Sequence, residues 1–183
     1  MTRVSVPYCR RSFLFFAAAA GTTLVVRPDT SSAAESATRI LALHSRWSSE
    51  NFIGPFFERG TYLPDALSEI DHLFRDRHNN EVARIDVRLL NLLHSFKQCS
   101  GYRASFEVVC GYRSAATNRM LRKKSRRVAK DSRHIVGQAV DVRFYGLDVA
   151  EAHRLALAMK AGGVGYYPRQ NFIHLDVGPV RSW

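Results

Sequence analysis

Long apolar runs, cysteines and acidic residues are all scarce in this chain of 183 residues. The longest apolar stretch, residues 15–26, is rich in alanine and interrupted by Gly21-Thr22-Thr23. It is therefore short for a membrane-spanning helix, which needs roughly 20 apolar residues. Internal repeats and low-complexity segments are also missing. The simplest organisation is one compact domain behind a short N-terminal leader.

The N-terminal segment has the pattern of an export signal. Arg10 and Arg11 form a twin-arginine pair in front of the apolar stretch, and the small residues 32–34 provide a cleavage site before Glu35. We predict a Tat-type signal peptide over residues 1–34, a mature domain over residues 35–183 and a periplasmic location. No stable membrane anchor is expected once the signal is removed; a leader that stays uncut as an anchor is the alternative.

The shortage of acidic residues makes the protein basic. Sixteen Asp and Glu stand against 27 Lys and Arg, a net charge of +11. Removing the leader takes away four arginines and one aspartate, which leaves 23 basic and 15 acidic side chains, or +8. For an exported protein we expect an anionic cell-wall glycopeptide as partner and no nucleic acid. The basic run at residues 119–133 is either a solvated helix face or a surface that attracts wall-peptide carboxylates.

Strand patterns appear at both ends of the mature chain. Residues 39–44 and 51–57 flank a polar turn, which predicts a small hairpin. Further strands are predicted at residues 105–110, 140–145 and 172–177.

Four helices are predicted between these strands. Three begin at Asp65, Asp86 and Asp148, where Asp148 forms a capping box with Glu151, and a short basic helix follows residues 111–114. Gly162-Gly163 ends the last of them. We expect a single α+β domain in which a small antiparallel sheet carries the functional site and helices pack around it.

Only two cysteines remain after the leader, Cys99 and Cys110. The extended segment before Cys110 spans roughly 20 Å, whereas bridged Cα atoms lie within about 7 Å. Two buried thiols are therefore favoured over a disulfide. A role for Cys110 as an additional metal ligand is also open.

Two histidines and an aspartate near the C-terminus form a candidate metal site. His134 and Asp141 are separated by six residues, and His174 lies in the last predicted strand. If the strands of Asp141 and His174 are neighbours, both side chains project to one point. The small residues Gly137 and Ala139 would let the loop approach a metal. Two nitrogens and one oxygen suit Zn²⁺, and three protein ligands leave a position for water, as in hydrolytic zinc sites.

The residues around this site resemble a known group of enzymes. The pattern Ser-x-His-x2-Gly-x-Ala-x-Asp at residues 132–141 is similar to the zinc signature of the LAS group, which comprises lysostaphin-type peptidases, D-alanyl-D-alanine peptidases and the hedgehog signalling domain. The blocks at residues 111–118, 162–169 and 172–183 look like its murein endopeptidase K branch. The resemblance covers residues 39–183 and implies cleavage of peptide cross-links in peptidoglycan.

The resemblance also implies roles for other residues. Arg113 resembles the family's arginine that faces the metal, where it would stabilise an oxyanion; fixing the local turn is its alternative role. Ser132, Tyr166 and Tyr167 are candidates for substrate binding, although each tyrosine has ordinary packing as an alternative.

The general base is the point at which this sequence departs from several relatives. They place Glu or a second His shortly before the last histidine ligand, where this chain has Asn171 and Phe172. Asp176 is the nearest carboxylate, and it acts either as the base or as a residue that orients a ligand. Two other functions stay open beside the endopeptidase: a carboxypeptidase that trims stem peptides, and a wall-binding zinc protein without turnover.

Overall fold

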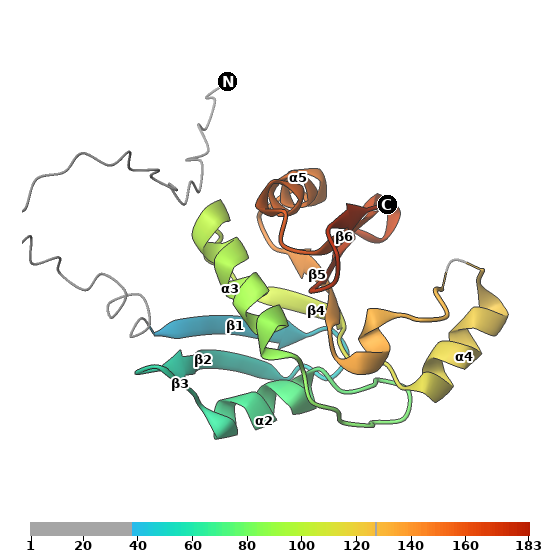
Figure 1. Ribbon diagram of the computed structural model, residues 1–183, viewed down its shortest axis with the longest axis horizontal. Coiled ribbons are helices and arrows are strands. Elements are labelled where there is room, and N and C mark those ends of the chain that lie inside the picture. The colour runs from blue at the N-terminus through green and yellow to red at the C-terminus, as the bar shows by residue number, and fades with distance from the viewer. Residues whose placement is uncertain (1–37, 127) are drawn as a thin grey trace, which may run out of the picture.

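The computed structural model describes residues 38–126 and 128–183 (Figure 1). The predicted signal peptide, residues 1–34, lies outside this part of the chain. Among the residues that the structure describes, no helix is both long enough and apolar enough to cross a membrane.

Eight strands of the described chain form one sheet in the order β3-β2-β1-β4-β5-β7-β6-β8. Their bounds are β1 Arg39–Ser45, β2 Asn51–Glu58, β3 Thr61–Tyr62, β4 Phe106–Cys110, β5 Ala139–Phe144, β6 Gly163–Tyr167, β7 Phe172–Asp176 and β8 Arg181–Ser182. The pairs β1–β4 and β6–β8 are parallel and the others antiparallel. The α+β class is confirmed, but the expectation of a small antiparallel sheet is wrong, because the N-terminal hairpin joins the C-terminal strands through β1 and β4.

The helices follow the predicted order, with one difference at a cap. They are α2 Pro64–Leu73, α3 Val87–Ser100, α4 Ala115–Lys124 and α5 Val149–Met159. Asp86 and Asp148 accept hydrogen bonds from main-chain N–H groups at the starts of α3 and α5, as expected. Asp65 is not a cap: α2 begins at Pro64 after Leu63, and Asp65 lies in its first turn. Proline is favoured there because its missing N–H has no acceptor in a first turn.

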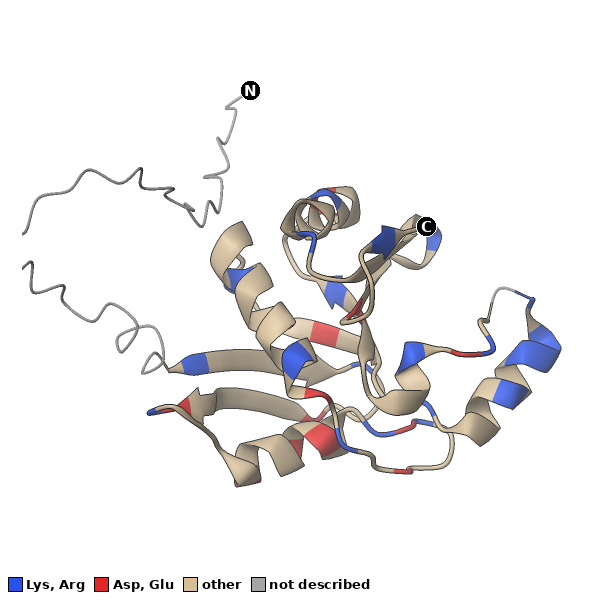
Figure 2. Ribbon diagram, in the orientation of Figure 1, with Lys and Arg blue, Asp and Glu red and all other residues tan. Residues whose placement is uncertain are grey.

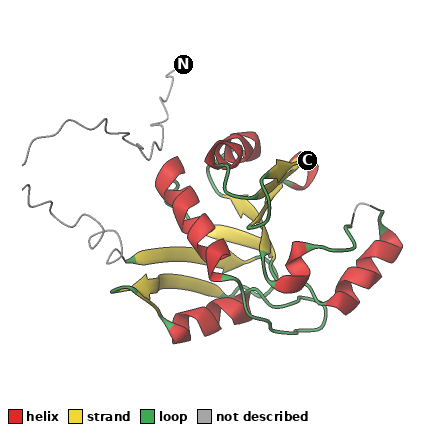
Figure 3. Cartoon of the chain, in the orientation of Figure 1, coloured by secondary structure: helices red, strands yellow, loops and turns green. Residues whose placement is uncertain are grey.

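The sheet has a core face and a site face. Val140, Val142, Ile173 and Leu175 are buried in the core, where α5 packs on β5, β6 and β7 and α3 packs on β1 and α5. Side chains alternate along a strand, so Asp141 and His174 lie on the opposite face. Figure 3 shows α3 and α5 beside the sheet and α4 projecting away from it.

Strands β6 and β8 were not predicted from the sequence. Gly163 and Gly165 lower the β-propensity of this segment, yet both lie within β6. A Cβ at Gly163 would come within 2.4 Å of Asp176 Oδ2, and one at Gly165 within 2.8 Å of the Trp183 ring. The glycines therefore make room for side chains that cross over the site face.

Candidate metal centre

His134, Asp141 and His174 meet on the site face of the sheet. Asp141 and His174 are direct partners in the antiparallel pairing of β5 and β7, which is the arrangement their predicted convergence required. His134 comes from a single 3-10 turn, Arg133–Val136, just before β5. All three residues are at least nine-tenths buried.

The three donor atoms form a compact triangle. His174 Nδ1 lies 3.0 Å from Asp141 Oδ1, His134 Nε2 lies 3.2 Å from His174 Nδ1, and His134 Nε2 lies 3.3 Å from Asp141 Oδ1. A tetrahedral zinc site with bonds of about 2.0–2.1 Å separates its ligand atoms by about 3.3 Å. The donor set and its spacing thus fit a divalent metal of this kind.

Hydrogen bonds fix which nitrogen of each histidine faces the triangle. His134 Nδ1 lies 2.7 Å from the carbonyl oxygen of Gly111. A carbonyl only accepts, so Nδ1 carries a proton and Nε2 is the nitrogen that can bind a metal once it is deprotonated. His174 Nε2 lies 3.0 Å from Asp176 Oδ2 and donates to it, which leaves Nδ1 toward Asp141. Such outer partners set the tautomer and ring orientation of metal-binding histidines.

His134 and Asp141 shift each other's pKa in opposite directions. Burial disfavours a charged imidazole, but the Asp141 carboxylate outweighs it and raises the pKa of His134 to about 10. Burial likewise opposes ionisation of Asp141, yet His134 and His174 hold the pKa of that carboxyl well below its usual range. A metal would therefore displace a proton from His134, as is general for histidine ligands.

Asp176 lies beside the triangle and is fully buried. Its carboxylate accepts from the backbone N–H of Gly178 at 2.8 Å, from both terminal nitrogens of Arg181 at 2.5 and 3.1 Å, and from His174. Burial alone would raise the pKa of Asp176, but these donors outweigh burial and hold the pKa well below its usual range. Its acceptor positions are thus largely taken.

Arg113 lines a cavity of about 280 Å³ that borders Asp141. Its guanidinium donates to Asn118 Oδ1 at 3.2 Å and contacts Cys110 Sγ at 3.5 Å. Its Nε is buried with no hydrogen-bond partner among the described residues. Arg113 and Asp141, one of the three candidate metal ligands, thus line the same cavity.

Cys110 reaches the site through an irregularity in β4. The pairing of β4 with β5 shifts register after Val108, so that Cys110 rather than Val109 lies opposite Asp141. The donor atoms of Cys110, His134 and Asp141 lie within 4.8 Å of one another. Cys99 and Cys110 are not joined by a disulfide, as the favoured interpretation expected, but both residues are half-buried rather than buried.

The three candidate substrate residues lie in different places. Tyr167 is on the site face, where it stacks on Phe172 with ring centres 4.6 Å apart. Tyr166 points to the core face and stacks on His153 of α5 at 4.6 Å. Ser132 is the residue before the 3-10 turn of His134, and its side chain makes no capping hydrogen bond. The structure therefore brings Tyr167, but not Tyr166, to the face of the ligands.

The small residue Gly137 serves another contact than the one expected. A Cβ there would lie 2.2 Å from the carbonyl oxygen of Arg84, and its φ is +65°. The loop thus needs glycine to pack on the segment before α3.

Sequence reasoning assigned no role to Arg181 and Trp183. Arg181 binds Asp176, and the Trp183 ring lies 5.1 Å from the His174 ring. Their only signal was their place in the last of the matching blocks.

An α+β sheet domain that presents two histidines and an aspartate beside a cavity lined by a half-buried arginine defines the LAS-type metallopeptidase class. The chain belongs to the family described as "Peptidoglycan L,D-endopeptidase MepK", whose profile matches residues 32–183.

Similar proteins carry the same description. The peptidoglycan L,D-endopeptidase MepK of Escherichia coli strain K12 is 38% identical over 165 residues, which cover 90% of this chain and 91% of the relative. The probable peptidoglycan L,D-endopeptidase MepK of Haemophilus influenzae is 42% identical over 146 residues, 79% of this chain and 78% of the relative. No solved structure matches the chain.

Proposed function

We propose that this protein is an exported zinc metallopeptidase that hydrolyses peptide cross-links in peptidoglycan. The observation that carries the proposal is the triangle of His134, Asp141 and His174, with edges of 3.0–3.3 Å, next to a cavity. The relatives' names supply the substrate, since two of them are called peptidoglycan L,D-endopeptidases.

The donor set favours zinc as the metal. Two imidazole nitrogens and one carboxylate are a known catalytic zinc set, whereas Mg²⁺ and Ca²⁺ prefer oxygen ligands alone. A zinc ion held by these three residues would lower the pKa of a bound water to about 7 and polarise the scissile carbonyl.

Arg113 supports the reaction from the cavity wall. Its buried Nε lacks a hydrogen-bond partner in the described part of the chain, and its guanidinium lies beside the cavity that Asp141 borders. A fixed cation in a partly desolvated site stabilises developing negative charge on a carbonyl oxygen. On the site face, Tyr167 is available for substrate contact. Ser132, which precedes the turn that carries His134 and whose side chain makes no capping hydrogen bond, is a second candidate for such contact.

Asp176 is assigned here to positioning rather than to proton transfer. The carboxylate already accepts five hydrogen bonds, two from Arg181 and one each from Gly178, Gly163 and His174. A group with a pKa far below neutrality and occupied acceptor positions is a weak base. Its bond to His174 Nε2 instead keeps Nδ1 of that ring free for the metal.

Export by the Tat route is part of the proposal. It rests on Arg10, Arg11 and the small residues 32–34, and it agrees with a substrate that lies outside the cytoplasm.

Purified protein incubated with defined muropeptides tests the proposal. We expect loss of cross-linked dimers and the appearance of uncross-linked monomers, abolished by a chelator and restored by Zn²⁺. Monomers with shortened stem peptides, with the cross-linked dimers left intact, would instead identify a carboxypeptidase. Binding of wall material without any product would identify a non-catalytic zinc protein.

A further inference from the structure

The cavity beside the metal centre has a second wall that the proposed reaction does not use. This second wall consists of Trp47 and of residues 75–78 and 80, and the same cavity is lined by Asp141, Cys110 and Arg113. A peptide that fills the cavity therefore contacts both groups of residues.

Trp47 forms a fixed platform on that wall. Its indole Nε1 donates to the carbonyl oxygen of Val109 at 2.7 Å, while 52% of the residue stays exposed. The guanidinium of Arg77 lies 4.1 Å from the centre of the Trp47 ring. Stacking on an indole face orients a guanidinium and leaves its edge available for hydrogen bonds.

The loop that carries Arg77 is held firmly by its neighbour. Asp76 is 1% exposed, and its carboxylate accepts from the backbone N–H groups of His78 at 2.9 Å and Ser114 at 2.8 Å. The N–H of Asn80 donates to the Asp76 carbonyl oxygen at 2.8 Å. The main chain on either side of Arg77 is therefore fixed by these hydrogen bonds.

The charges on the cavity wall are unevenly paired. Arg75 is bound by Glu50 at 2.6 Å, and Asp76 is occupied by backbone N–H groups. Within the described part of the chain, Arg77 and Arg113 have no carboxylate at ion-pair distance. Two guanidinium groups thus line one cavity without a partner of opposite charge.

We propose that Arg77, stacked on Trp47, binds a free carboxylate of the peptide substrate while the scissile bond lies at the metal centre. This inference rests on the proposed function, because wall peptides carry free carboxylates and Arg113 is already assigned to the reacting carbonyl. The arginine edge binds carboxylates through two parallel hydrogen bonds. The protein then discriminates between peptides whose carboxylates are free and peptides in which they are amidated.

Binding measurements test this independently of turnover. Zinc-loaded full-length protein is titrated, by calorimetry, with a stem peptide that has free carboxylates and with its amidated form. We expect the wild type to bind the free form about tenfold more tightly, equivalent to about 1.4 kcal/mol. Arg77→Gln should remove this preference. Arg77→Lys should retain part of it, because the charge stays but the planar fork is lost.

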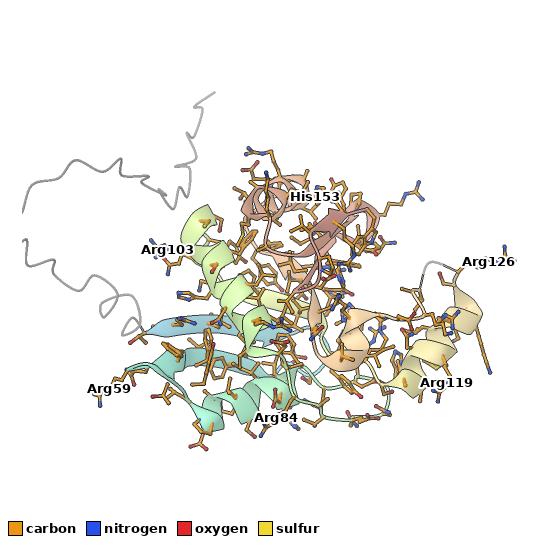
Figure 4. The ribbon with its side chains drawn as sticks, in the orientation of Figure 1. Arg59, Arg84, Arg103, Arg119, Arg126 and His153 are labelled. Atoms are coloured by element: carbon orange, nitrogen blue, oxygen red, sulfur yellow. The ribbon has the colours of Figure 1, made fainter. Side chains whose placement is uncertain are left out.

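Arg59→Gln is the matched control. It removes the same charge from an exposed position in the turn after β2, and Figure 4 shows Arg59 on the opposite side of the molecule from α4, whose residues Thr117 and Leu121 line the cavity. This variant should keep the wild-type preference, and circular dichroism verifies that all variants are folded.

Three results would overturn the inference: equal affinity of the wild type for both peptides, an unchanged preference in Arg77→Gln, or no binding of either peptide. Failure of the proposed function gives a different result. In that case the wild type cleaves no cross-link but still prefers the peptide with free carboxylates, and Arg77→Gln still removes that preference.

Discussion

Replacing Asp176 by asparagine separates the two roles of this carboxylate, base and positioning group. In the structure Asp176 is fully buried and accepts hydrogen bonds from His174, Arg181 and Gly178. Asparagine keeps the shape but removes the charge, and its NH₂ group cannot accept a hydrogen bond. One of the bonded N–H groups therefore loses its acceptor, and His174 loses its charged partner.

The two roles predict effects of different kinds. If Asp176 positions His174, zinc affinity falls 10- to 100-fold, as is typical for outer-shell partners, and turnover recovers at saturating zinc. If it is the general base, zinc affinity stays unchanged and turnover falls by roughly 10²–10⁴ at any zinc concentration. Unfolding should become easier by about 1–3 kcal/mol for the buried group left without a partner, toward the low end because the Arg181 side chain is 41% exposed.

Competition with a chromophoric chelator gives the zinc affinity, and muropeptide hydrolysis over a zinc titration gives turnover. Asp65→Asn in the exposed first turn of α2 is the control for loss of one carboxylate. Asp176→Asn with wild-type zinc affinity and with turnover that no amount of zinc restores would refute the positioning role.

Three further outcomes are expected. Gly137→Ala should destabilise the fold by more than about 1 kcal/mol in urea unfolding, because its Cβ would lie 2.2 Å from a carbonyl oxygen, whereas Gly60→Ala has the same positive-φ strain with open space and should cost less. The hydrogen bond to Glu81 raises the pKa of Tyr112 to about 12. The stability that this bond adds to the fold is therefore complete below the unfolded-state pKa of about 10 and disappears as pH rises through about 12. A pH titration followed by phenolate absorbance should show this high step in the wild type and lack it in Tyr112→Phe. Cys110→Ser should retain zinc affinity within a few-fold, since three ligands suffice, and a loss beyond tenfold would make Cys110 a ligand.

The parts of the fold with strong local signals were predictable. Asp86 and Asp148 cap their helices because a side-chain oxygen can bond the first free N–H groups wherever the rest of the protein lies. The convergence of Asp141 and His174 was expected on the condition that their strands are neighbours, and the pairing of β5 with β7 meets this condition.

Other features depend on contacts that are distant in sequence. Strand β6 contains two glycines, and its existence depends on β7, β8 and the side chains of Asp176 and Trp183. The position of Cys110 depends on one extra residue in β4, and no residue pattern in the sequence predicts this irregularity. The bonds that occupy Asp176 come from Arg181 and a turn that form only when β8 joins the sheet, so sequence alone left its role open.

The basic run at residues 119–133 lies at one side of the molecule. Figure 2 shows Lys and Arg gathered on α4 and the segment that follows it, away from the sheet. Arg77 in the cavity, which has no carboxylate at ion-pair distance within the described part of the chain, is the more specific candidate for contact with a substrate carboxylate.

Zinc titration of chelator-treated protein, with the loss of cross-linked muropeptide dimers as readout, tests the central claim most directly. We predict no hydrolysis without metal, a rate that reaches its plateau at about one zinc per chain, as the single three-ligand site requires, and no recovery in His174→Ala at the same zinc concentration. Undiminished hydrolysis after metal removal, or by His174→Ala, would contradict the account.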